Sequence, residues 1–116
     1  MTMTTDDTFE LYNLEITVEG DPDTFVCSHA SGLAMTVVGE NLIFKQDRFS
    51  MYALAALLPL LPVKQRPTHK NDWMTSDENI ACPDPNCGGL FRITRTDMTK
   101  FSHAETTDVP LPTTEE

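Results

Sequence analysis

Basic residues are scarce in this sequence. Its 116 residues include 8 lysines and arginines against 18 aspartates and glutamates, which gives a formal net charge of −10 at pH 7. Phosphate backbones and anionic lipid headgroups repel such a chain, so roles in nucleic-acid binding or at a membrane surface are disfavoured. The acidic surplus is typical of a surface that keeps a small protein in solution.

Long hydrophobic runs are missing as well. The longest apolar stretch, residues 51–63, is too short to span a bilayer and is interrupted by Pro59 and Pro62. The N-terminal residues 1–7 contain neither a basic region nor an apolar run, so we expect no secretory signal there. An odd number of cysteines, three, argues against a disulfide framework and favours a reducing compartment. We therefore expect a cytoplasmic protein.

Familiar catalytic motifs are also lacking. The sequence has no Gly-rich phosphate-binding loop, no serine-centred nucleophile elbow and no HExxH pair. Its apolar fraction of 40% is nevertheless that of an ordinary globular protein. The length allows one domain.

Alternating apolar residues predict an antiparallel sheet. Leu14, Ile16 and Val18 alternate with polar neighbours, which indicates a half-buried strand that ends at the turn 20–23. Two later apolar runs flank a glycine-containing turn and predict a hairpin. The expected extended segments are residues 9–18, 24–27, 33–38, 42–44 and 90–95.

Residues 51–58 predict a helix with an unusual surface. Ser50 is a good N-cap, alanine and leucine dominate the segment, and Pro59 and Pro62 should end it. The helix has no polar face, and a helix that is apolar all round must be buried all round. We expect its second side to contact a protein partner or a second copy through Met51–Leu61; the alternative is that strands wrap both sides.

These elements predict an α+β fold, with a small antiparallel sheet or half-barrel packed on the one apolar helix. A single domain is expected over residues 9–96. Residues 1–8 and 97–116 are polar, acidic and without apolar periodicity, so we expect flexible, disordered tails there.

A rigid turn that carries two thiols is the sharpest chemical feature. Cys82 and Cys87 enclose Pro83-Asp84-Pro85-Asn86, and Cys27 and His29 lie far upstream. Together the two pairs supply thiolate and imidazole ligands of the kind that tetrahedral Zn²⁺ takes, and a four-ligand site would be structural because no coordination position stays open. We therefore expect a metal site at Cys27, His29, Cys82 and Cys87, with zinc favoured over iron, since iron–sulfur clusters usually take four cysteines.

Two other interpretations of the cysteines remain open. The thiols are also the size and polarity of residues that fill small core sites. Alternatively, Cys82 or Cys27 is a nucleophile activated by a nearby histidine. The spacing of four residues between Cys82 and Cys87 differs from the two residues of an ordinary zinc knuckle.

A second polar group lies in the loop after the helix. Arg66, His69 and Asp72, with Trp73 and Asp84, suit a small catalytic pocket in which arginine binds a carboxylate or phosphate and histidine acts as acid or base. The alternative is a solvated loop that Trp73 anchors to the core.

The segment 51–95 resembles an uncharacterised family of small bacterial and archaeal proteins. The residues that carry the resemblance are Tyr52-Ala53-Leu54, Leu57-Leu58-Pro59, Arg66, Trp73, Cys82-Pro83-Asp84-Pro85 and Phe91-Arg92-Ile93-Thr94-Arg95. Upstream, residues 14–18 and Cys27 are similar to the family's opening strand and first cysteine. The resemblance brings no established activity. The chain departs from the family pattern at His29, which follows Cys27 sooner than the family's Gly-His pair does, and at Cys87, which is not a usual family residue.

Three functions are compatible with these features. The first is a small accessory or interaction subunit of a larger complex or homo-oligomer, with a structural metal. The second is the small subunit of a heteromeric enzyme that uses the Arg66, His69 and Asp72 group or a reactive Cys82. The third is an iron-binding redox protein.

Overall fold

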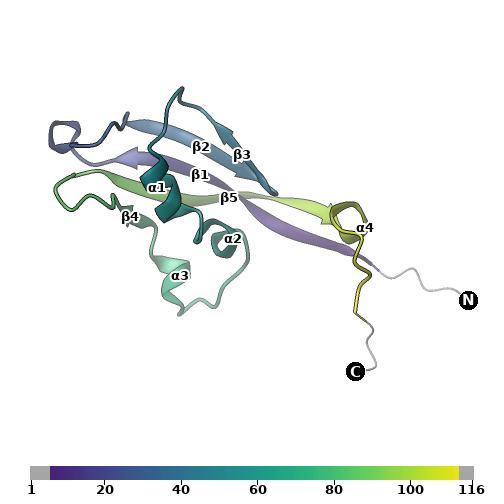
Figure 1. Cartoon of the computed structure of the whole chain (residues 1–116). Coiled ribbons are helices and arrows are strands. Elements are labelled where there is room, and N and C mark those ends of the chain that lie inside the picture. Colours follow the sequence, from purple (N-terminus) through teal and green to yellow (C-terminus); the bar gives the residue numbers. More distant parts are fainter. Residues whose placement is uncertain (1–5, 113–116) are drawn as a thin grey trace, which may run out of the picture.

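Five antiparallel strands form one open sheet in the order β3-β2-β1-β5-β4 (Figure 1). The computed structural model describes residues 6–112. The strands are β1 Thr8–Glu19, β2 Gly32–Val38, β3 Asn41–Phe44, β4 Asn79–Ala81 and β5 Leu90–Ser102. The helices are the 3₁₀ turn η1 Pro22–Thr24 and α1 Met51–Leu57, α2 Leu61–Lys64, α3 Trp73–Ser76 and α4 His103–Thr106. The predicted α+β class is confirmed. Within residues 6–112, no helix has the length and apolar character needed to cross a membrane.

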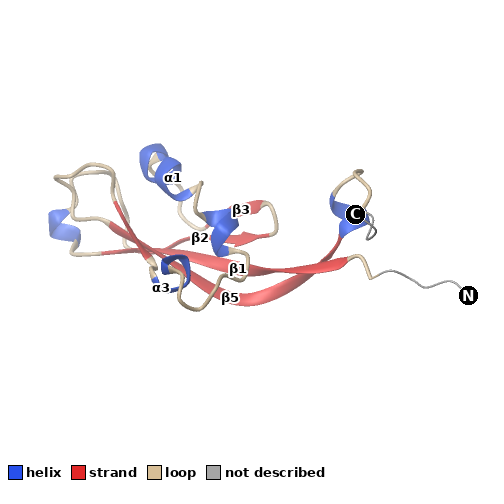
Figure 2. Cartoon of the chain, turned by 90° about the horizontal axis from the view of Figure 1, so that it is seen from below, coloured by secondary structure: helices blue, strands red, loops and turns tan. Residues whose placement is uncertain are grey.

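The core lies between one face of the sheet and α1. Ile16 on β1 is fully buried, opposite Ile93 on β5 and Met35 on β2, so the alternation in the sequence correctly marks the inner face. Ala53 and Leu57 of α1 pack against this inner face and complete the core. Figure 2 shows α1 lying over one side of the sheet. The predicted hairpin of β2 and β3 is also confirmed.

Helix α1 begins and ends where the sequence predicts. The Ser50 hydroxyl oxygen accepts a hydrogen bond from the Ala53 N–H at 3.3 Å, and the helix ends before Pro59. Only one side of the helix is covered, however. Ala53 and Leu57 are 0% exposed, whereas Met51 and Tyr52 are each 69% exposed. The alternative in which strands wrap both sides is therefore wrong.

The last strand is longer than the sequence suggests. We placed its end at residue 95 and a tail from residue 97, but β5 continues to Ser102 and α4 follows it. The reason is a long-range pairing: residues 98–102 lie opposite residues 8–12 of β1, and the rings of Phe9 and Phe101 stack at 5.6 Å. The two strands form a ribbon that extends away from α1, α2 and α3 and has α4 at its far end (Figure 1). Of the tails expected at residues 1–8 and 97–116, residues 1–5 and 113–116 lie outside the described residues.

Two shorter elements also differ from expectation. The segment 24–27 is not a strand, because the 3₁₀ turn η1, which Asp21 caps, reaches into it at Thr24. Helix α3 begins at Trp73, where the Asp72 carboxylate accepts from the Met74 N–H at 2.9 Å. Strand β4 was not anticipated, because three residues are too short for a periodic signal.

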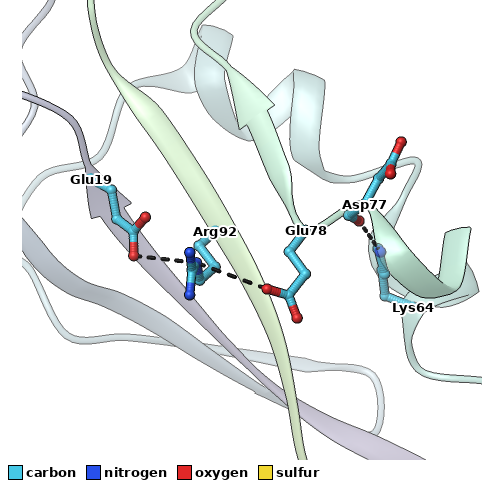
Figure 3. Close-up of polar contacts among 5 residues, drawn as sticks. All are labelled: Glu19, Lys64, Asp77, Glu78 and Arg92. Atoms are coloured by element: carbon cyan, nitrogen blue, oxygen red, sulfur yellow. Dashed lines mark hydrogen bonds and ion pairs between the residues drawn. The ribbon is translucent and has the colours of Figure 1, made fainter. Parts of the chain in front are cut away.

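Two cations contact the segment around α3 and β4: Arg92 of β5 and Lys64 of α2 (Figure 3). Arg92 lies between Glu19 of β1, at 3.4 Å, and Glu78, at 4.0 Å. These pairs are exposed and contribute little stability. Lys64 is buried instead, and its ammonium donates to the carbonyl of Met74 at 2.6 Å and to that of Asp77. Burial lowers the pKa of Lys64.

We expect Lys64→Met to reduce the free energy of unfolding by about 2–3 kcal/mol, because the two carbonyls lose a charged donor and stay shielded from water. The exposed Lys70→Met is the matched control and should change stability by less than about 0.5 kcal/mol. Urea denaturation of both variants measures the difference. Equal stability of the two variants would show that the Lys64 contacts do not hold α3 in place.

Candidate metal centre

Two loops meet at one end of the sheet (Figure 1). The loop 20–31 follows β1, and the loop 82–89 precedes β5. Because β1 and β5 are antiparallel neighbours, with Glu19 opposite Leu90, the loop after β1 and the loop before β5 lie at the same end of the sheet. The upstream pair of candidate ligands and the proline-rich turn are therefore brought side by side.

The four predicted ligands converge in these loops. We call Cys27, His29, Cys82 and Cys87 the Cys/His cluster; its ligand atoms all lie within 4.8 Å of one another. The Sγ atoms of Cys27 and Cys82 are 3.6 Å apart, and His29 Nε2 is 3.4 Å from Cys82 Sγ. A tetrahedral zinc ion with bonds of about 2.3 Å to sulfur and about 2.05 Å to nitrogen has S···S and S···N edges of roughly 3.8 and 3.6 Å. The cluster is thus compatible with a four-coordinate metal.

Glycines allow the two loops to approach. The Gly88 N–H donates to the Thr24 carbonyl at 3.0 Å, and a Cβ on Gly88 would fall 1.9 Å from Thr24 Oγ1. Gly20 has a φ of 97°, and a Cβ there would lie 2.5 Å from the Gly88 carbonyl oxygen. Any side chain at either position would force the loops apart and with them the two pairs of ligands.

The proline turn is held by its own backbone. The Asp84 carbonyl accepts from the Cys87 N–H at 3.0 Å, and its carboxylate accepts from the Asn86 N–H at 2.9 Å. The Cys82 N–H donates to the Gly89 carbonyl at 3.0 Å, which closes the turn at its base. Cys82 and Cys87 are consequently pre-organised before any ligand binds. Asp84, which the sequence suggested for a different pocket, has its Oδ2 3.8 Å from Cys27 Sγ.

The electrostatics of the thiols favour a bound cation. Burial opposes ionisation of Cys87, but the surrounding backbone at Cys27, Gly89 and Val26, whose N–H donates to the sulfur at 3.4 Å, lowers its pKa to about 7. The hydrogen bond with Cys82, together with burial and Cys87, raises the pKa of Cys27 to about 12. Ionisation is thus favoured at Cys87 and opposed at Cys27, and a bound metal would displace the protons that remain on its ligands.

His29 is oriented by aromatic rings. Its imidazole packs edge-on against Phe25 at 5.6 Å and Phe91 at 5.1 Å. The His29 N–H donates to the Cys27 carbonyl at 2.9 Å, so a tight turn lets both side chains of the Cys-x-His pair face one point. A Cβ on Gly89 would lie 2.8 Å from the ring. Burial lowers the pKa of His29, which keeps the ring neutral, as metal ligation requires.

The second predicted group is arranged differently. Arg66 donates to the Pro62 carbonyl at 2.9 Å, His69 Nδ1 accepts from the Asn71 N–H at 3.0 Å, and the Asp72 side chain caps α3. Among residues 6–112, no hydrogen bond joins these three side chains to one another. Trp73 is largely exposed and does not anchor the loop to the core. Catalysis by Arg66, His69 and Asp72 stays a prediction without a shared geometry to support it.

Comparison with family models, curated proteins and solved structures finds no match for this chain. The family resemblance of residues 51–95 therefore also stays a prediction, and a function has to be argued from the geometry of the chain itself.

Proposed function

We propose that this protein is a small interaction subunit whose fold is closed by a structural Zn²⁺ ion at the Cys/His cluster. The observation that carries the proposal is the match between the 3.6 and 3.4 Å contacts of the cluster and the edges of a zinc tetrahedron. Zinc is preferred to iron because three thiolates and one imidazole form a common structural zinc set, whereas iron–sulfur clusters usually take four cysteines.

The role of the metal would be to fasten loops rather than to perform chemistry. Four protein ligands leave no open coordination position for a substrate. Zinc would neutralise the thiolates, and the chain would supply the N–H donor of Val26 that stabilises Cys87. Small domains often need such a clamp, because a core of this size gives limited stability.

Elemental analysis of protein purified without an affinity tag tests the metal. We expect about one zinc per chain and a lower melting temperature after treatment with a chelator. A metal-free protein whose melting temperature is unchanged in chelator would refute the proposal. Iron with visible absorbance would support the redox alternative instead.

The partner is proposed to bind the uncovered side of α1. The exposed apolar residues along and just after the helix are Met51, Tyr52, Leu58 and Val63. Because these residues follow one another within a short segment, they form a natural contact surface for a second copy or another protein. The net charge of −10 favours a partner that is itself not strongly acidic when the partner is a different protein.

Light scattering coupled to size-exclusion chromatography tests self-association. In a homo-oligomer, Tyr52→Ser should weaken association by about tenfold or more, since buried tyrosines are frequent hot spots. Val109→Ser is the matched control, because Val109 is similarly exposed but lies beyond β5, and it should leave association unchanged. A clean monomer would exclude the homo-oligomer. In that case, wild type and Tyr52→Ser are each used to capture binding proteins from the native host, which tests for a different partner. Equal recovery of the same protein by both would refute α1 as the contact.

A further inference from the structure

Two cysteines of the cluster are in direct contact. Cys27 and Cys82 come from different loops, and their sulfur atoms are 3.6 Å apart. A disulfide requires about 2.05 Å, so side-chain rotation has to close a gap of roughly 1.5 Å. All three cysteines are free thiols. The geometry therefore places two oxidisable sulfurs within reach of one another.

The third cysteine is restrained from joining this reaction. Cys87 Sγ accepts a hydrogen bond from the Val26 N–H at 3.4 Å. Cys87 and Cys82 also belong to one turn, whose backbone is fixed by the Asp84 and Gly89 carbonyls. A bond between Cys82 and Cys87 would distort that turn, whereas a bond between Cys27 and Cys82 joins two loops that already touch.

We propose that the cluster is a reversible redox site at which a peroxide joins Cys27 to Cys82 and releases the metal. This inference rests on the zinc site proposed above. One sulfur attacks a peroxide oxygen, the O–O bond breaks, and a sulfenic acid forms. The second sulfur then displaces hydroxide to form the S–S bond. The two thiolates lose two electrons in total, and hydrogen peroxide with two protons becomes two water molecules.

The oxidised chain loses two of its four ligands at once. His29 and Cys87 remain, and two ligands hold zinc far more weakly than four. The disulfide replaces the metal as the link between the loops 20–31 and 82–89, so the two loops stay joined while zinc leaves. A dithiol reductant returns both electrons and restores the site.

Titration of the zinc-loaded wild-type chain with hydrogen peroxide tests the proposal. Zinc content is measured first, release is followed with a chromogenic chelator, and remaining thiols are alkylated. Cleavage on the amino side of aspartate, at Asp84, separates Cys82 from Cys87, so mass spectrometry identifies the bonded pair. We expect free thiols to fall from three to one, zinc release in step with that loss, and rebinding after dithiol treatment.

Two variants sharpen the assignment. Cys87→Ser retains both partners and should still form the Cys27–Cys82 bond, whereas Cys82→Ser should not. A zinc-loaded wild-type chain that keeps its metal and three thiols in excess peroxide would overturn this inference but leave the proposed function intact. A main product that joins Cys82 to Cys87, or that carries sulfinic acid, would overturn it as well. A chain isolated without zinc would refute the proposed function itself.

Discussion

Replacement of Cys82 by serine should abolish stoichiometric zinc binding and lower the melting temperature by about 15 °C. Cys82 is buried, and its sulfur contacts both Cys27 and His29, so it is the proposed ligand that would join the two loops. A ligand at a thousandfold excess over its dissociation constant stabilises the folded state by about 4 kcal/mol. In a domain of this size each kcal/mol corresponds to roughly 4 °C.

Asn86→Ala is the matched control for this variant. Asn86 lies in the same turn and is exposed, and only its backbone N–H takes part in the turn. The Asn86→Ala protein should bind one zinc per chain and have a melting temperature within about 2 °C of that of wild type. Calorimetry and elemental analysis of both proteins give the comparison. If Cys82→Ser and wild type have the same melting temperature in the presence of zinc, the metal has no structural role.

The second large effect is expected for Gly88→Ala, which should weaken zinc affinity at least tenfold. The new Cβ would fall 1.9 Å from Thr24 Oγ1 and 2.6 Å from Thr24 Cβ, so the loops have to separate. Overpacking of this kind costs about 1–3 kcal/mol. Part of this cost should appear as weaker zinc affinity, because the clash displaces the adjacent residue, Cys87. Competition with a chromogenic chelator measures the affinity.

Two proteins control for the glycine variant. Gly32→Ala introduces backbone strain without a steric clash, because Gly32 has a φ of 104° and no atom lies within 4 Å of the added Cβ. The free energy of unfolding should therefore fall, while zinc affinity should not change. The double variant Gly88→Ala with Thr24→Gly removes the clashing side chain and should recover most of the affinity. If zinc affinity falls equally in Gly32→Ala and Gly88→Ala, contact between the loops does not set the geometry of the site.

Local patterns in the sequence were sufficient for most of the sheet and for the start of α1. Ile16 and its alternating neighbours mark the inner face of β1, and Ser50 marks the helix N-terminus. Residues 96–102 could not be placed in the same way, because threonine, aspartate and lysine interrupt any apolar alternation there. Residues 98–102 form a strand by pairing with residues 8–12. Pairing between the two ends of a chain leaves no local signal.

The members of the Cys/His cluster were also predictable, while the contacts that bring them together were not. Cysteine and histidine are the residue types that zinc takes, so four positions were named correctly as a cluster that comes together. The contacts of Gly88 with Thr24 and of Gly89 with His29 depend on how two distant loops meet. Asp84 was predicted to share a small pocket with Arg66, but the turn places its Oδ2 3.8 Å from Cys27 Sγ.

The most direct test of the account is zinc X-ray absorption spectroscopy on the protein as purified. We expect a shell of three sulfur atoms at about 2.3 Å and one nitrogen atom at about 2.0–2.1 Å. His29→Ala should replace the nitrogen by an oxygen from water and leave the three sulfurs unchanged. A shell made mainly of oxygen atoms, or one without sulfur, would contradict a structural zinc site at Cys27, His29, Cys82 and Cys87.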